Sequence, residues 1–297
     1  MSNETIEQSF NVGSPANLKL GNISGSVDIQ TGQDGIIHIR AIKHAGSGDA
    51  ERTSIELLQA EDGTVTVNTR YGENNWGWLL GHQVCDVEYI VSAPRQCSIT
   101  VNGVSSDLSI SGFDGVFSLK SVSGDMSLDN LSGSLNVETV SGDVSGNRLT
   151  GKSHLKSVSG DIYLQDSTLP TVNCNTVSGD VNLHTPLLEG PYKFHSVSGD
   201  VHMLIPATSQ FDVDLHSVSG DFTTNFPVCQ TSLGTGKITA RLGTGGSSIT
   251  FTSVSGDLQV ESSSEIPPAP QVNKLEILSK LENGELSVDE ALLKLNQ

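Results

Sequence analysis

Six aspartates recur at nearly regular intervals, and each directly follows a glycine: Asp125, Asp143, Asp161, Asp180, Asp200 and Asp221. Each one closes a pentapeptide of the form Ser/Thr-Val-Ser-Gly-Asp, and a seventh copy closes at Asp257. Hard cations such as Ca²⁺ prefer carboxylate ligands. A column of these aspartates could therefore bind divalent cations.

The position of the aspartate within its turn favours a different role. Calcium-binding β-rolls place the aspartate two residues after a glycine, whereas here it follows directly, and alternate units carry Ser134 or Lys152 at that place. An aspartate after glycine in a turn can accept backbone N–H hydrogen bonds while its charge faces water. We expect this structural role, with the divalent-cation module as the alternative.

Histidines are the other metal-ligating residues of the repeats: His154, His184, His195, His202 and His216. We expect His195 and His216 to stack, but the spacing of Cys and His does not match a closed metal site. The sequence also lacks a singular carboxylate pair, a phosphate-binding loop and the common hydrolase motifs. We therefore expect no enzyme and no cofactor.

The spacing of the aspartates predicts the elements that position them. The Asp-to-Asp intervals are 18, 18, 19, 20, 21 and 36 residues, so the last interval would contain one degenerate copy. Glycines recur every nine residues from Gly115 to Gly160, and apolar residues follow them at period two, which indicates short half-buried strands. A fixed repeat of this length predicts a parallel β-solenoid of ~18-residue coils. An elongated antiparallel two-sheet sandwich is the alternative.

Two further expectations follow from stacking the coils. The apolar residues two before each glycine, such as Val122, Val140 and Val158, should point inward. The outward residues Lys120, Glu138 and Lys156 should stack directly with alternating charge, which is favourable at strand spacing.

The sequence divides into four parts. Residues 1–100 form a less regular β region and cap, 101–262 the repeat solenoid, 263–272 a Ser/Pro linker, and 273–297 two short helices. Leucines share one face of each helix, and short helices need a partner to bury them. We predict partner binding or self-association through Leu278, Leu281, Leu292 and Leu295. The alternative is that this surface folds back onto the end of the solenoid.

The loop Asn74–His82 holds both tryptophans of the chain, Trp76 and Trp78. An apolar loop beside the first coil would serve as an end cap, because the ends of a solenoid must be covered. Its alternative role is contact with a partner or a membrane surface, so Trp76 and Trp78 join the predicted partner-binding residues.

The net charge of −18 argues against binding nucleic acid or anionic membranes, because both need Lys/Arg-rich surfaces. Met1–Gly13 lacks the basic start and apolar stretch of a signal peptide, and no segment has the ~20 apolar residues of a transmembrane helix. We therefore expect a cytoplasmic location. Cys174 falls at an inward position, and the cysteines show no close pairing.

The repeated Val-Ser-Gly-Asp units over Asn17–Val260 resemble a bacterial family of β-strand-repeat domains of unknown function often labelled "putative adhesin". The segment Asn273–Leu295 resembles a SHOCT-like helical hairpin, carried by Leu278, Leu281, Gly284, Leu286, Ser287, Asp289, Glu290 and Ala291. The resemblance implies a mainly β scaffold or protein-interaction protein, with some relatives linked to envelope-stress responses. It implies no catalytic residues.

Overall fold

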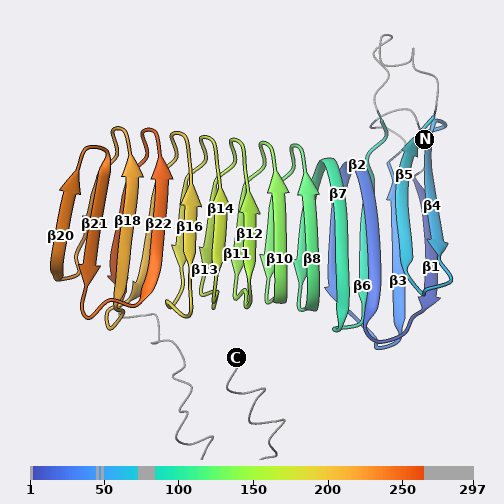
Figure 1. Ribbon diagram of the computed structural model, residues 1–297. Helices are drawn as coiled ribbons and strands as arrows, with labels where there is room; N and C mark the ends of the chain where they lie inside the picture. The colour runs from blue at the N-terminus through green and yellow to red at the C-terminus, as the bar shows by residue number, and fades with distance from the viewer. Residues whose placement is uncertain (1–2, 45–46, 48–49, 73–83, 264–297) are drawn as a thin grey trace, which may run out of the picture.

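The computed structural model describes residues 3–44, 47, 50–72 and 84–263, and these form 23 β-strands and no helix. The strands build two long faces packed against each other (Figure 1). β2 (Ala16–Thr31) and β7 (Cys97–Ser111) each run through a bend from one face to the other. The front face also contains β4 (Thr53–Gln59), β5 (Val65–Tyr71), β8 (Asp114–Ser121), β10 (Ser132–Thr139), β12 (Ser153–Lys156), β14 (Val172–Asn175), β16 (Tyr192–His195), β22 (Ser247–Ser253), β18 (Phe211–Ser217), β21 (Lys237–Leu242) and β20 (Val228–Gly234).

The back face runs in the same direction with its own strands. It contains β1 (Glu4–Asn11), β3 (Ile36–Lys43), β6 (Val87–Ala93), β9 (Met126–Asp129), β11 (Val144–Asn147), β13 (Ile162–Gln165), β15 (Val181–His184), β17 (Val201–Pro206), β23 (Leu258–Ser263) and β19 (Phe222–Thr224). Each coil supplies one strand to the front face, turns at its Val-Ser-Gly-Asp segment, and supplies one strand to the back face. Neighbouring coils pair in parallel throughout, as in β8–β10–β12 and β9–β11–β13. The predicted parallel solenoid is confirmed.

The regular stack begins at β2, before the boundary expected at residue 100. Within β2, Ser24 aligns with Ser105, and Ser26 aligns with Asp107 of β7, so Ile23–Ser26 occupies the place of a Val-Ser-Gly-Asp turn. Antiparallel strands close this end on both faces: β5–β4 extends the front face, and β6–β3–β1 extends the back face.

The order of the coils in space differs from their order in the chain at the other end. β22 pairs with both β16 and β18, and β23 pairs with both β17 and β19, so the last coil lies between two earlier ones. The prediction of a degenerate solenoid copy between Asp221 and Asp257 is wrong. The intervening chain instead forms the antiparallel hairpin β20–β21, which pairs antiparallel with β18.

The core is a narrow layer between the two faces, filled by the inward residues of each strand. In β8, Phe117, Leu119 and Ser121 alternate inward and are buried. At the turns from back to front, Phe113, Leu131, Leu149 and Leu169 also point into this layer. Cys174 lies in it as predicted, and burial raises the pKa of its thiol to about 12.

The motif glycines bring the backbones of neighbouring coils together at every Val-Ser-Gly-Asp turn. A Cβ atom built on Gly142 would lie 2.0 Å from the carbonyl oxygen of Gly124, and one built on Gly160 would lie 2.0 Å from that of Gly142. Both values are far below van der Waals contact. The glycines are therefore required by close approach between coils.

We predict that Gly142→Ala lowers the free energy of unfolding by at least about 2 kcal/mol, because the added methyl group overlaps backbone that cannot move without disturbing the ladder. Thermal or urea unfolding measures this loss. Gly13→Ala is the matched control, since no atom lies within 4 Å of its added Cβ. Equal stability of the two variants would contradict the close-approach argument.

Candidate functional site

The turns that carry the pentapeptide form one long edge of the solenoid, which we call the motif edge. The first residue of the pentapeptide, Ser or Thr, points inward. In the turns of Thr139, Ser157, Ser196, Ser217 and Ser253, its hydroxyl oxygen accepts a hydrogen bond from the glycine N–H of the same turn. The Oγ–N distances are 2.9 Å for Ser157 and Gly160, and 2.7 Å for Ser196 and Gly199. This internal bond fixes the shape of the turn, so the remaining motif residues recur in the same place in every coil.

The motif aspartates form a continuous hydrogen-bonded column along this edge. One carboxylate oxygen of each aspartate accepts the backbone N–H of the aspartate in the next coil. For example, Asp143 Oδ1 lies 2.9 Å from the nitrogen of Asp161, and Asp161 Oδ1 lies 2.9 Å from that of Asp180. The column runs in the order Asp107, Asp125, Asp143, Asp161, Asp180, Asp200, Asp257 and Asp221.

This geometry gives the aspartates a structural role of the kind expected from their place after glycine. The donated N–H comes from the adjacent coil, so the bond joins coils and does not close a single turn. The second carboxylate oxygen is not used by the column. Within the described part of the chain, no three His, Cys, Asp or Glu side chains form a group that could hold a metal ion. The divalent-cation site at Asp125, Asp143, Asp161, Asp180, Asp200 and Asp221 stays a prediction.

The column also concentrates negative charge. Tyr163 donates its phenolic hydrogen to Asp161 Oδ2 at 3.0 Å. This hydrogen bond, together with the negative charges of Asp161, Asp143 and Asp180, raises the pKa of Tyr163. A basic group of a binding partner would be stabilised by the same field.

The motif valines form a second row beside the aspartates, which we call the valine ridge. The ridge runs in the order Val104, Val122, Val140, Val158, Val177, Val197, Val254 and Val218. Each carbonyl oxygen accepts an N–H from the next coil, as in the bond of 2.9 Å from Ser159 to Val140. Seven steps at strand spacing make the ridge about 34 Å long.

The valines are not core residues. Val140 is 44% exposed and Val158 is 45% exposed, so the prediction that these residues and Val122 point inward is wrong. The inward positions of the preceding strand end at the motif Ser or Thr, and alternation places the next residue outside. An exposed apolar row of this length on a soluble surface is typical of an interaction site.

The front face carries the charge pattern expected from the repeat. Lys120 lies 2.8 Å and Lys156 3.6 Å from carboxylate oxygens of Glu138, which confirms the alternation of charge. The hydrogen bond from Lys120 is the main cause of a lowered pKa at Glu138. His195 and His216 do not stack, because the inserted β22 places Thr252 between them.

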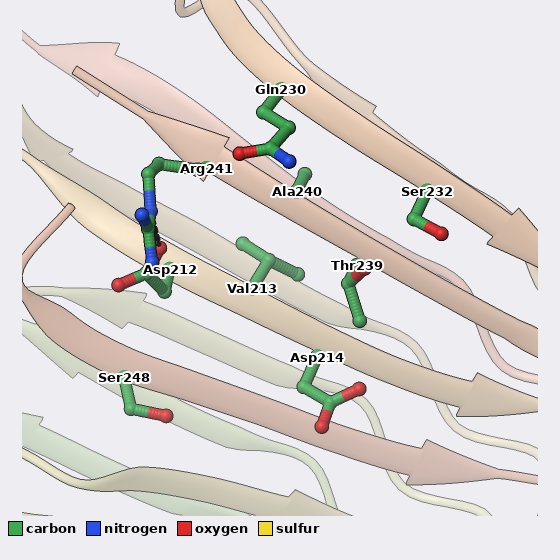
Figure 2. A pocket seen from close by; sticks show the side chains of 9 residues that line it. All are labelled: Asp212, Val213, Asp214, Gln230, Ser232, Thr239, Ala240, Arg241 and Ser248. Carbon is green, nitrogen blue, oxygen red and sulfur yellow. Dashed lines mark hydrogen bonds and ion pairs between the residues drawn. The ribbon is translucent and has the colours of Figure 1, made fainter. Parts of the chain in front are cut away.

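A shallow depression of about 460 Å³ lies on the front face over β18, β21 and β20 (Figure 2). Arg241 Nε lies 2.7 Å from Asp212 Oδ1, and Lys237 Nζ lies 3.2 Å from Asp214 Oδ1. These charges neutralise each other in pairs on an open surface. The depression therefore lacks the desolvated acid–base arrangement that a catalytic site needs.

The remaining predicted contact residues lie outside the described residues. These are Trp76 and Trp78 of the loop, and Leu278, Leu281, Leu292 and Leu295 of the C-terminal segment. The predicted SHOCT-like hairpin, and all but Ser263 of the linker predicted at 263–272, also lie there. The described residues contain no helix, and so none long and apolar enough to cross a membrane.

Comparison with known proteins identifies relatives at the level of the fold. The sequence profile described as "Toastrack DUF4097" matches residues 16–261. A structure from Bacteroides fragilis NCTC 9343, described as a "putative adhesin", is similar with a TM-score of 0.49 at 13% identity, covering 88% of this chain and 97% of that one.

Two structures from Parabacteroides distasonis ATCC 8503 are similar at lower scores. One, described as a "putative adhesin", has a TM-score of 0.40 at 10% identity and covers 88% of this chain and 97% of its own. The other, described as a "putative lipid binding protein", has a TM-score of 0.37 at 9% identity and covers 88% and 96%. Among curated proteins, none matches the chain.

Two substitutions at one aspartate separate the structural role of the column from cation binding. Asp161→Asn keeps an oxygen that can accept the N–H of Asp180 and removes one repelling charge, so we expect unchanged or higher stability. Asp161→Ala removes the acceptor and should cost about 1 kcal/mol. Thermal unfolding of both variants measures the difference.

Calorimetric titration of the wild-type protein with calcium completes this test. We expect no saturable site with a Kd below about 10 μM, which lies within the range of sensor sites. Stoichiometric calcium binding that disappears in Asp161→Asn would instead establish the divalent-cation alternative.

Proposed function

Because the chain belongs to the Toastrack family, we propose that it is a non-catalytic protein-interaction module, and that a partner docks along the motif edge. The observation that carries this proposal is the valine ridge. It is a straight apolar row held by backbone hydrogen bonds between coils, with a row of carboxylates beside it.

The chemistry of the two rows defines the partner. Apolar side chains would cover the valines, while Lys or Arg residues would face the aspartate column. A ridge fixed by backbone contacts loses little conformational freedom on binding, so more of the contact energy is available for affinity. The partner surface should therefore be elongated and basic, with an apolar strip along its centre.

The ordinary environment of the titratable groups supports a role without catalysis. Several described charged groups of the front face lie in exposed pairs, among them Lys120–Glu138 and Arg241–Asp212. The strongly raised pKa values of Cys97 and Cys174, each about 12, result from burial in the core, which makes these thiols poor nucleophiles.

Four finer predictions accompany this proposal. Leu278, Leu281, Leu292 and Leu295 could supply a second contact through the C-terminal hairpin, and Trp76 and Trp78 a third. The cytoplasmic location and a link to envelope-stress responses also stay predictions. The valine ridge does not depend on any of them.

A triple variant of the ridge tests the proposal. Val140→Ser, Val158→Ser and Val177→Ser together should abolish capture of partner proteins by the immobilised full chain, because they interrupt the apolar row at its centre. Each residue is already half exposed, so we expect the melting temperature to change by only a few degrees. Quantitative mass spectrometry of retained proteins from cells of the source organism gives the readout.

Val116→Ser is the matched control, because Val116 is 58% exposed but lies on the front face away from the ridge. Partners should be retained by the wild type and by this control, and lost from the triple variant. Binding should also weaken as salt is raised, since the aspartate column contributes charge. Retention of the same partners by all three proteins would exclude the ridge as the docking surface.

A further inference from the structure

The two ends of the solenoid are closed differently. At the N-terminal end, antiparallel strands extend both faces beyond β2, and inward residues such as Ile39 of β3 and Val67 of β5 are fully buried. At the other end, β21 and β20 extend only the front face beyond β18. The described residues supply no back-face strand beyond the three-residue β19 (Figure 1).

The inward side of β20, the outer strand of this hairpin, is therefore uncovered, whereas Ala240 and Leu242 of β21 are buried. The register aligns Leu215 with Ile238 and Leu233, and Val213 with Ala240 and Thr231, so Thr231 and Leu233 continue the inward rows of the core. Leu233 is nevertheless 75% exposed. Every residue of β20 is exposed, although its sequence, Val-Cys-Gln-Thr-Ser-Leu-Gly, contains no charge.

The exposure of the last valine of the ridge also indicates that nothing covers this end among the described residues. Val218 belongs to the terminal coil and is 81% exposed, whereas its neighbour Val254 is 51% exposed. Val218, Leu233 and Ile238 line a depression of about 330 Å³ at this end. Polar residues, among them Ser219, Asp221 and Lys237, share this lining with the apolar side chains. We call this depression, together with the uncovered side of β20, the open end.

We infer that the C-terminal segment 273–297 of the same chain covers the open end. The described part of the chain ends close to this surface: β23 ends at Ser263 and pairs with β19, the last back-face strand. The backbone N–H of Ser262 donates to Asn225 Oδ1 at 2.9 Å, just before β20 begins at Val228. The described chain thus ends one strand away from the missing back-face layer.

The length and sequence of the remaining chain fit this placement. Residues 264–272, if extended, span about 30 Å, and β20 is about 20 Å long. The segment therefore reaches along the whole overhang. Its leucines at helical spacing, Leu275, Leu278 and Leu281, supply an apolar face for an apolar surface. This role is distinct from the partner contact predicted for the hairpin, because here the leucines bind their own chain.

A cysteine reporter inside the overhang tests the inference in the full chain. Thr231→Cys in a Cys229→Ser background places one thiol on the inward side of β20, while Cys85, Cys97 and Cys174 are buried. We expect N-ethylmaleimide to react with this thiol at least tenfold faster when Leu278→Asp and Leu281→Asp are added. Asn273→Asp and Asn283→Asp, which add the same charge away from the leucine face, should leave the rate unchanged.

Equal and fast reaction in all three proteins would overturn the inference. A reaction of the introduced thiol that becomes slower as the protein concentration is raised would also overturn the inference, because a second copy would then be the occupant. A reaction that becomes slow only after a cell extract is added would overturn it as well, and would assign the surface to a partner protein.

A reciprocal change in the solenoid avoids relying on the tail variants. Leu233→Glu should increase the rate of trypsin cleavage at Lys274, Lys280 and Lys294 by releasing the segment. Leu58→Glu is the matched control, because Leu58 is 59% exposed on β4 at the opposite end. Equal cleavage rates in the two variants, with melting temperatures matched, would contradict the proposed contact.

Discussion

Backbone contact between successive coils is the constraint on which this structure depends. Coils can pair as parallel strands only about 4.8 Å apart, and at the motif edge this spacing brings the carbonyl oxygen of one glycine against the Cα of the next. Any side chain at that position would separate the coils and break the ladders on both faces. The hydroxyl bond within turns such as Ser157–Gly160 and the aspartate bond between turns both preserve this approach.

The same constraint turns single residues into surface rows. Since each coil repeats the turn with the same shape, one valine and one aspartate per coil become a ridge and a column along the molecule. The column places like charges side by side, and hydrogen bonding from the neighbouring N–H offsets that repulsion. In such a surface, substitutions within the repeat change the exposed side chains, while the backbone contacts keep their spacing constant. This combination suits recognition of an extended partner.

Much of the fold could be predicted, because alternation in segments such as Phe117–Ser121 and the nine-residue glycine spacing have direct physical meanings. The exposure of Val158 could also be predicted, because alternation through the inward Ser157 places the next residue outside. The apolar character of valine suggested burial instead. The position of the last coil could not be predicted from the sequence. Near-identical motifs at Asp200, Asp221 and Asp257 offer equivalent pairing surfaces, and only tertiary contacts choose among them.

The insertion of that last coil has a consequence for how the chain reaches its native state. A solenoid whose coils stack in chain order can grow from one end as it emerges from the ribosome. Here β18 and β19 reach their native neighbours only after β22 and β23, made later, have docked on β16 and β17. Native assembly of this end must wait for some forty residues of further synthesis, and the finished coil then cannot unravel from the C-terminus without first parting four established ladders.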